Sequence, residues 1–214
     1  MALSKVDYNS LNVTAAASKA LKWNSSADGF ETGDLVGGLV LLATETASSS
    51  ATIDFTSGID STYKKYVFKW IDIHPATDGT DFTFQTDTGT NTSYNQTMTT
   101  IMFRSENNEA DTSNDLSYQT GGDQAQGTAF QDICGEVGND NDQSCTGTLH
   151  LYDPSNTTFV KHWTAIGNSY KNTDFSKHTY TGGYVNTTTA LTRVQFKMSS
   201  GNIDAGVIKM YGVK

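Results

Sequence analysis

The last stretch of the chain, Leu191–Tyr211, restricts the fold more than any other. In its first half apolar and polar residues alternate, which places Val194, Phe196 and Met198 on one face of a strand. Residues 207–211 alternate as well, and a loop with two glycines, an asparagine and an aspartate separates the two halves. This pattern predicts a β-hairpin with one apolar face. A two-stranded ribbon is barely stable alone, so the hairpin is expected to dock inside a larger sheet.

Segments with the same period of two recur along residues 35–214. The longest, Tyr63–Ile73, is apolar on both faces, which is typical of a central strand. Roughly a dozen such segments are separated by turns rich in Gly, Asn, Asp and Thr, and no amphipathic helix of about 10–15 residues lies between them. The sequence therefore predicts an all-β fold, an antiparallel β-sandwich of jelly-roll type.

The closing strands also have predicted partners. Jelly rolls commonly pair late strands with early ones. We therefore expect the C-terminal segment to pair with the apolar strands Leu39–Thr44 and Ala51–Thr56. That pairing would bring the end of the chain close to the start of the sandwich.

Residues 1–34 differ from the rest of the chain. Val13–Leu21 is rich in alanine but is short and has few apolar anchors, so one helical turn and an extended arm both remain open. Residues 24–30 form a cluster of turn-favouring residues. We interpret residues 1–34 as a short N-terminal arm that needs a partner surface, followed by a β-sandwich domain over residues 35–214.

Charge and hydropathy exclude two classes of partner. The formal net charge is −9, and the Lys and Arg residues are scattered, so a phosphate backbone would be repelled and no nucleic-acid partner is predicted. No apolar run approaches the roughly 20 residues that cross a bilayer, which predicts no membrane insertion. The first residues show no signal-peptide pattern, so we expect a protein that stays in the cytoplasm or leaves when the cell lyses.

The chain has two cysteines, Cys134 and Cys145, which flank a short polar loop. If their segments face each other, the two thiols can meet. A disulfide closing this loop would stabilise the fold by about 2–3 kcal/mol. The alternative is a pair of reduced, buried thiols, as is usual in the cytosol. Both interpretations remain open.

Two groups of residues resemble metal sites without completing one. If residues 153–158 form a hairpin loop, His150 and His162 fall opposite each other, and two imidazoles can bind a divalent metal. No third ligand is visible, so polar residues on a solvent-facing strand are the preferred interpretation. Asp140 and Asp142 lie in an acidic turn whose spacing does not match a calcium loop. The sequence predicts no metal and no cofactor.

Catalytic motifs are missing as well. The sequence contains no Gly-x-Ser-x-Gly elbow, no His-Glu-x-x-His and no phosphate loop. Glycoside hydrolysis needs a carboxyl group with a raised pKa, and we find no lone carboxylate in a strongly apolar strand. We therefore predict that the protein is not an enzyme and has no catalytic residues.

Aromatic residues suggest a different kind of site, because exposed rings can stack on sugars. Trp163, Tyr170 and Tyr184 lie in a part of the chain rich in Tyr, Asn and Thr, and they are the candidate glycan-stacking residues. Trp23 and Trp70 are expected to lie in the core instead.

Several segments resemble a known group of proteins. These are residues 5–31, the Ile-Asp-Phe-Thr at 53–56, Tyr66–Phe68, the Pro-Ala-Thr-Asp-Gly at 75–79, and the ending 196–214. Together they resemble short virion surface proteins of marine tailed phages, of the cyanophage type. The resemblance implies jelly-roll modules that assemble as trimers on a head or a tail. Its motifs are structural, so no functional residue is carried over. The segment 105–145 lies outside the resemblance.

From these observations we predict a structural protein on the surface of a tailed bacteriophage virion, either a fibre or a capsid decoration. The β-sandwich would form a homotrimer, and the N-terminal arm would attach it to other virion structural proteins. The alternative is a carbohydrate-binding or host-receptor-binding module whose ligand is a host surface glycan. A depolymerase-type enzyme ranks last. Head and tail locations remain open.

Overall fold

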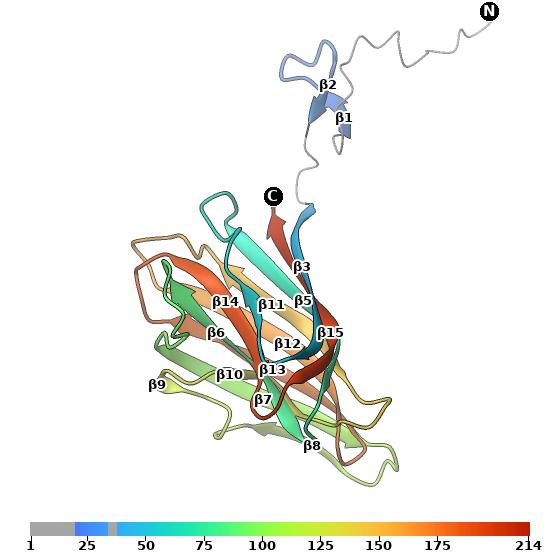
Figure 1. Cartoon of the computed structure of the whole chain (residues 1–214). Coiled ribbons are helices and arrows are strands. Elements are labelled where there is room, and N and C mark those ends of the chain that lie inside the picture. Colours follow the sequence, from blue (N-terminus) through green and yellow to red (C-terminus); the bar gives the residue numbers. More distant parts are fainter. Residues whose placement is uncertain (1–19, 34–37) are drawn as a thin grey trace, which may run out of the picture. The chain divides into compact units, whose positions relative to one another are not determined.

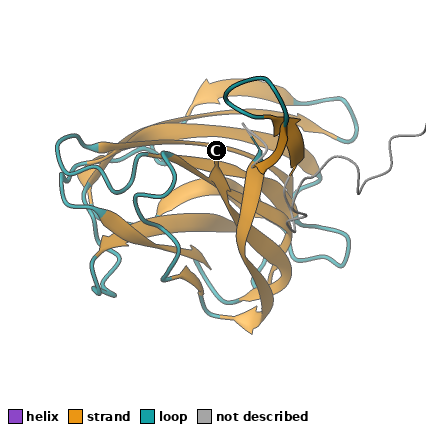
Figure 2. Cartoon of the chain, turned by 90° about the horizontal axis from the view of Figure 1, so that it is seen from above, coloured by secondary structure: helices purple, strands orange, loops and turns teal. Residues whose placement is uncertain are grey.

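A computed structural model describes residues 20–33 and 38–214, and all regular secondary structure in these ranges is β-strand (Figures 1 and 2). No helix that could span a membrane occurs in the described ranges. The chain divides into a small N-terminal unit, residues 1–38 with Lys214, and a large unit, Leu39–Val213.

The small unit contains a β-hairpin, formed by β1 (Ala20–Trp23) and β2 (Phe30–Gly33). Residues 24–29 make its turn, as the cluster of turn residues predicted. Of the segment Val13–Leu21, for which a helical turn and an extended arm were both open, Ala20 and Leu21 lie in β1, and Val13–Lys19 lie outside the described residues.

Strands β3–β15 of the large unit are linked by pairing into one 13-stranded network. Their bounds are β3 Leu39–Ser50, β4 Ile53–Phe55, β5 Lys65–Pro75, β6 Thr80–Thr88, β7 Met98–Asn108, β8 Asn114–Tyr118, β9 Ala125–Gly127, β10 Gln131–Val137, β11 Cys145–Tyr152, β12 Lys161–Lys171, β13 Phe175–Val185, β14 Leu191–Met198 and β15 Ile203–Val213.

Eight of these strands form a jelly roll. One sheet has the order β3-β15-β5-β11, and the other has the order β4-β14-β6-β10. The pairing is nested: β3 pairs with β15, β4 with β14, β5 with β11 and β6 with β10, and every pair is antiparallel. Nested pairing across two sheets is the double Greek key of a jelly roll. The predicted all-β, antiparallel sandwich of jelly-roll type is confirmed.

Two insertions enlarge the first sheet. Strands β7–β9 follow β6, and strands β12–β13 follow β11. They pair with one another, so the first sheet continues beyond β11 as β12-β13-β7-β8. We call this part the sheet extension. A single residue pair, Val137 with Lys171, links β10 of the second sheet to β12 of the extension.

The predicted C-terminal hairpin is wrong, although its partner strands are correct. β14 lies in the second sheet, where Val194 pairs with Phe55, and β15 lies in the first, where Lys209 pairs with Lys69. The loop between them crosses from one sheet to the other, and Gly201 supplies a φ of 72° there. Two strands that each have one apolar face can bury these faces in two ways. They can pair side by side in one sheet, or they can lie in opposite sheets with their apolar faces in contact.

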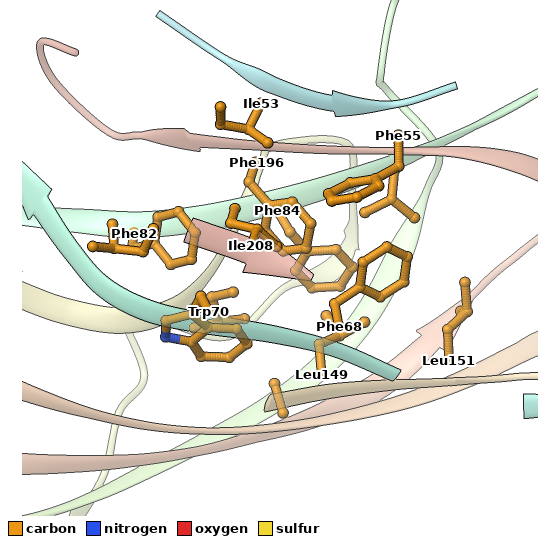
Figure 3. Packing of buried hydrophobic residues seen from close by; sticks show 14 of the residues in the cluster. Ile53, Phe55, Phe68, Trp70, Phe82, Phe84, Leu149, Leu151, Phe196 and Ile208 are labelled. Carbon is orange, nitrogen blue, oxygen red and sulfur yellow. The ribbon is translucent and has the colours of Figure 1, made fainter. Parts of the chain in front are cut away.

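The core lies between the two sheets, and Phe196 of β14 is at its centre (Figure 3). Its ring centroid lies 5.6 Å from those of Phe82, on the neighbouring β6, and of Phe68, on β5 of the opposite sheet. Trp70 is fully buried, as predicted. The same prediction is wrong for Trp23, which is 60% exposed and stacks on Phe30 across the small hairpin.

We predict that Phe196→Ala destabilises the whole large unit by about 3–5 kcal/mol, because it leaves a cavity between the sheets. Urea unfolding followed by tryptophan fluorescence should show one cooperative transition at a lower midpoint. The matched control is Phe103→Ala, because Phe103 is 40% exposed on the outer face, and we expect less than about 1 kcal/mol there. Equal losses for the two variants would contradict the central place of Phe196.

Candidate functional site

The outer face of the sheet extension carries a row of apolar and aromatic side chains. The register aligns Ile166 of β12, Tyr180 of β13, Phe103 of β7 and Tyr118 of β8. The rings of Phe103 and Tyr180 stack with centroids 4.8 Å apart and planes 9° apart. Ile166, Phe103 and Tyr118 are all exposed. Contiguous exposed apolar patches of this kind often mark surfaces that bind another molecule.

Beside this row lies a shallow trough across β12, β13 and β7. Two adjoining hollows of about 400 and 360 Å³ form it, and both are lined by Ile101, Thr164 and Gly182. Tyr184 borders one end of the trough, and Tyr180 borders the other. The side chains that line the two hollows carry no carboxylate, ammonium or guanidinium group.

A third hollow, of about 440 Å³, lies where β12 and β13 join. Its lining is polar. It comes from strand residues of β7, β12 and β13 and from Glu109 and Asp111 of the β7–β8 turn; the strand residues are Asn107, Asn108, Asn168, Ser169, Tyr170 and Ser176. The Tyr170 hydroxyl donates a hydrogen bond to Glu109 Oε1 at 2.8 Å. This bond to a carboxylate raises the pKa of Tyr170 to about 12. Tyr170 is therefore a neutral hydroxyl at physiological pH.

The structure separates the three candidate glycan-stacking residues. Tyr170 lines the polar hollow and Tyr184 lines the trough. Trp163 is 1% exposed, and its ring lies against Phe84 in the core with centroids 4.7 Å apart. A sugar cannot stack on it, so this part of the prediction is wrong. The alternation along β12 is the reason, because Trp163 and Tyr170 are an odd number of residues apart and point to opposite faces.

Ile101 and Phe103 were missed as site residues. They read as apolar members of one strand together with Met98. Met98 is fully buried, whereas Ile101 and Phe103 lie on the opposite face of β7 and are exposed. Ile101 and Phe103 are each an odd number of residues from Met98 in the sequence. This spacing indicates that they point to the opposite face of the strand.

Cys134 of β10 and Cys145 of β11 meet in the core, and both thiols are free and buried. Burial, followed by a hydrogen bond with the Cys134 thiol, raises the pKa of Cys145 well above its usual range. These are the properties of a pair of unreactive thiols.

The two histidines do not meet as expected. His150 lies opposite Thr164 and not opposite His162, so the register differs by two residues from the expected one. Burial, and then the charges of Lys65 and Lys69, lower the pKa of His150. Within residues 20–33 and 38–214, no group of three or more His, Cys, Asp or Glu side chains could hold a metal ion.

One carboxyl group contradicts the expectation that none would have a raised pKa. Burial, and then the charge of Asp81, raise the pKa of Asp132 on β10 to about 7, against the opposing effect of Lys177. Lys177 donates a hydrogen bond to Glu136 Oε2 at 2.8 Å. Asp132 belongs to this interior charge cluster and lines none of the three hollows.

Comparisons with known proteins give no family assignment. No family model, curated protein or solved structure matches the chain.

The raised pKa of Asp132 predicts a pH dependence of stability. The unfolded carboxyl group titrates near pH ~3.9, and the folded one titrates at about 7. The folded state therefore loses stability as pH rises between these values, because it must release a proton that it binds more tightly. The substitution Asp132→Asn removes this loss of stability, because asparagine has no carboxyl group to titrate.

Urea unfolding of the wild type and of Asp132→Asn measures the effect. We expect the variant's advantage to grow by about 2–4 kcal/mol between pH 4 and pH 8. Both proteins carry every other carboxyl group, so the difference reports Asp132 together with its interaction with Asp81. A difference that stays constant with pH would contradict the raised pKa.

Proposed function

We propose that the chain is a non-catalytic structural protein on the surface of a tailed bacteriophage virion, either a fibre or a capsid decoration. The hairpin β1–β2 carries this proposal. It forms part of a unit separate from the sandwich, and its Leu21, Trp23 and Phe30 side chains are exposed. A two-stranded ribbon is only marginally stable on its own, and exposed aromatic side chains favour contact with another protein. We therefore assign to residues 1–34 the role of attaching the protein to other virion structural proteins.

The jelly roll supports the same role. Double-sheet jelly rolls are frequent in viral capsid and lectin domains, although a fold alone does not define a function. The resemblance of both chain ends to marine phage surface proteins adds an independent reason, because it includes the arm as well as the closing strands.

The open edge at strand β3 supports self-association of the sandwich, which we propose gives a homotrimer. Among the described residues it pairs with β15 on one side and with no strand on the other, so a 12-residue edge is open. Leu39 and Leu41 on this strand are exposed. A long open edge with exposed apolar side chains invites pairing with another chain. A closed ring of subunits would cover this edge if it met a second surface of the neighbouring copy.

The outer face of the sheet extension favours a second candidate function, the binding of a host surface glycan. Tyr170 is surrounded by the amides of Asn107, Asn108 and Asn168, and Tyr184 borders an uncharged trough. Rings with nearby amides and hydroxyls are suited to the apolar faces and the hydroxyls of sugars. The two candidates are compatible, since a surface protein can also bind a receptor.

Removing the arm tests the proposed function. Purified particles of the phage that encodes the chain should contain the full-length protein, detected by immunogold labelling. A chain that lacks residues 1–34 should be absent from particles, because it has lost its attachment segment. Circular dichroism should confirm that the remaining sandwich is folded.

Two results would contradict the proposal. Particles without the full-length protein would refute the virion role, and normal incorporation of the shortened chain would refute the role of the arm. Light scattering on both proteins should give three times the chain mass, and a monomer would refute the trimer.

A further inference from the structure

Gly182 has no structural reason to be a glycine. It lies within β13, and its φ lies outside the positive range in which glycine is favoured. A Cβ atom there would approach nothing closer than 3.5 Å, the distance to the Trp163 carbonyl oxygen. The neighbouring Gly183 differs, because a Cβ atom on it would clash with the Thr99 carbonyl oxygen. Glycine weakens a strand interior, and it often marks a place where a ligand approaches the backbone.

We propose that the trough over Gly182 binds a neutral oligosaccharide. The inference rests on the carbohydrate-binding role proposed above and assigns that role a site. Glycine at position 182 keeps the floor of the trough open, and a larger side chain would fill it.

The ends of the trough suit a ligand with flat apolar faces. Tyr180 and Tyr184 flank Gly182 on the same outward face of β13, and their Cα atoms are separated by about 13 Å along an extended strand. Within the described residues, the hydroxyl groups of the two tyrosines make no hydrogen bond to the protein. These groups are therefore available to the hydroxyls of a sugar, and the rings offer apolar contact.

The sides of the trough add polar groups without charge. Thr164 and Thr99 supply hydroxyls, and His162 supplies an imidazole whose ring is in edge contact with Tyr184. No lysine or arginine lines the trough, and the chain as a whole has a net charge of −9. An acidic glycan would find no counter-charge, so we infer that the ligand is neutral.

A peptide strand is excluded by the position of the trough. β13 is paired along its length with β12 on one side and with β7 on the other. Strand addition needs an open sheet edge, and the trough lies inside the sheet. The open edge at β3 belongs to the opposite end of the same sheet, so self-assembly there would leave the trough free.

The test begins with the full-length protein on a printed array of defined neutral and acidic glycans. We expect binding to neutral glycans and none to acidic ones. The strongest neutral glycan is then titrated by calorimetry into the wild type, Gly182→Val and Thr148→Val. Thr148 also faces outward, on the neighbouring β11, but does not line the trough, so it is the matched control.

Gly182→Val should weaken binding by roughly tenfold or more, because its methyl groups occupy the floor of the trough. Its melting temperature should be unchanged or higher, since valine favours strands and a Cβ atom at this position makes only ordinary van der Waals contacts. Thr148→Val should bind like the wild type. Tyr184→Ala provides a second test with the same expected loss, and Tyr184→Phe, which keeps the ring, should lose less.

The possible failures are distinguishable. If the wild type binds no glycan, both the carbohydrate-binding role and the trough assignment are refuted. If it binds but Gly182→Val and Tyr184→Ala keep full affinity, the role stands and the trough assignment is refuted. A preference for acidic glycans would overturn the inferred ligand class. If light scattering shows that Gly182→Val dissociates the oligomer, the trough contacts a second copy of the chain and the inference is wrong.

Discussion

Contact between two apolar sheet faces is the interaction on which the rest of the structure depends. Phe196 belongs to β14 in the second sheet, and its ring meets Phe68 on β5 in the first sheet as well as Phe82 and Phe84 beside it. The nested pairing brings the last two strands to the centre of both sheets, where they pair with the earliest strands. The core is therefore complete only when the C-terminal strands are in place, which makes the sandwich dependent on contacts that are distant in the sequence.

The second sheet ends at β10, and charged side chains lie between β10 and the sheet extension. Glu136 of β10 accepts a hydrogen bond from Lys177 and forms ion pairs with Lys171 and Arg104. Although burial opposes ionisation, its hydrogen bonds with the two lysines lower the pKa of Glu136. These pairs connect β10 with β12, β13 and β7. A charge cluster thus adjoins the apolar core at the inner side of the extension, next to β10.

The sequence predicted the sandwich, most of its strands and the partners of the closing strands, because alternation reports which residues share a face. It did not predict β8 and β9, which lie in a polar stretch. It did not predict which sheet each strand joins, because the same pattern suits a side-by-side hairpin and two facing strands. That is why β14 and β15 were wrongly paired. Residues of a strand that are an odd number of positions apart point to opposite faces. Applied to β12, this rule would have placed Trp163 in the core and Tyr170 outside. The environment of Asp132 was not predictable, since Asp81 and Lys177 approach it from distant segments.

The central claim, that the closing strands lie in opposite sheets, is tested most directly by the nuclear Overhauser effects between backbone protons. The account predicts cross-strand effects between Val194 and Phe55 and between Lys209 and Lys69. It also predicts no ladder of effects between β14 and β15. A continuous ladder between these two strands would show a C-terminal hairpin and would contradict the jelly roll.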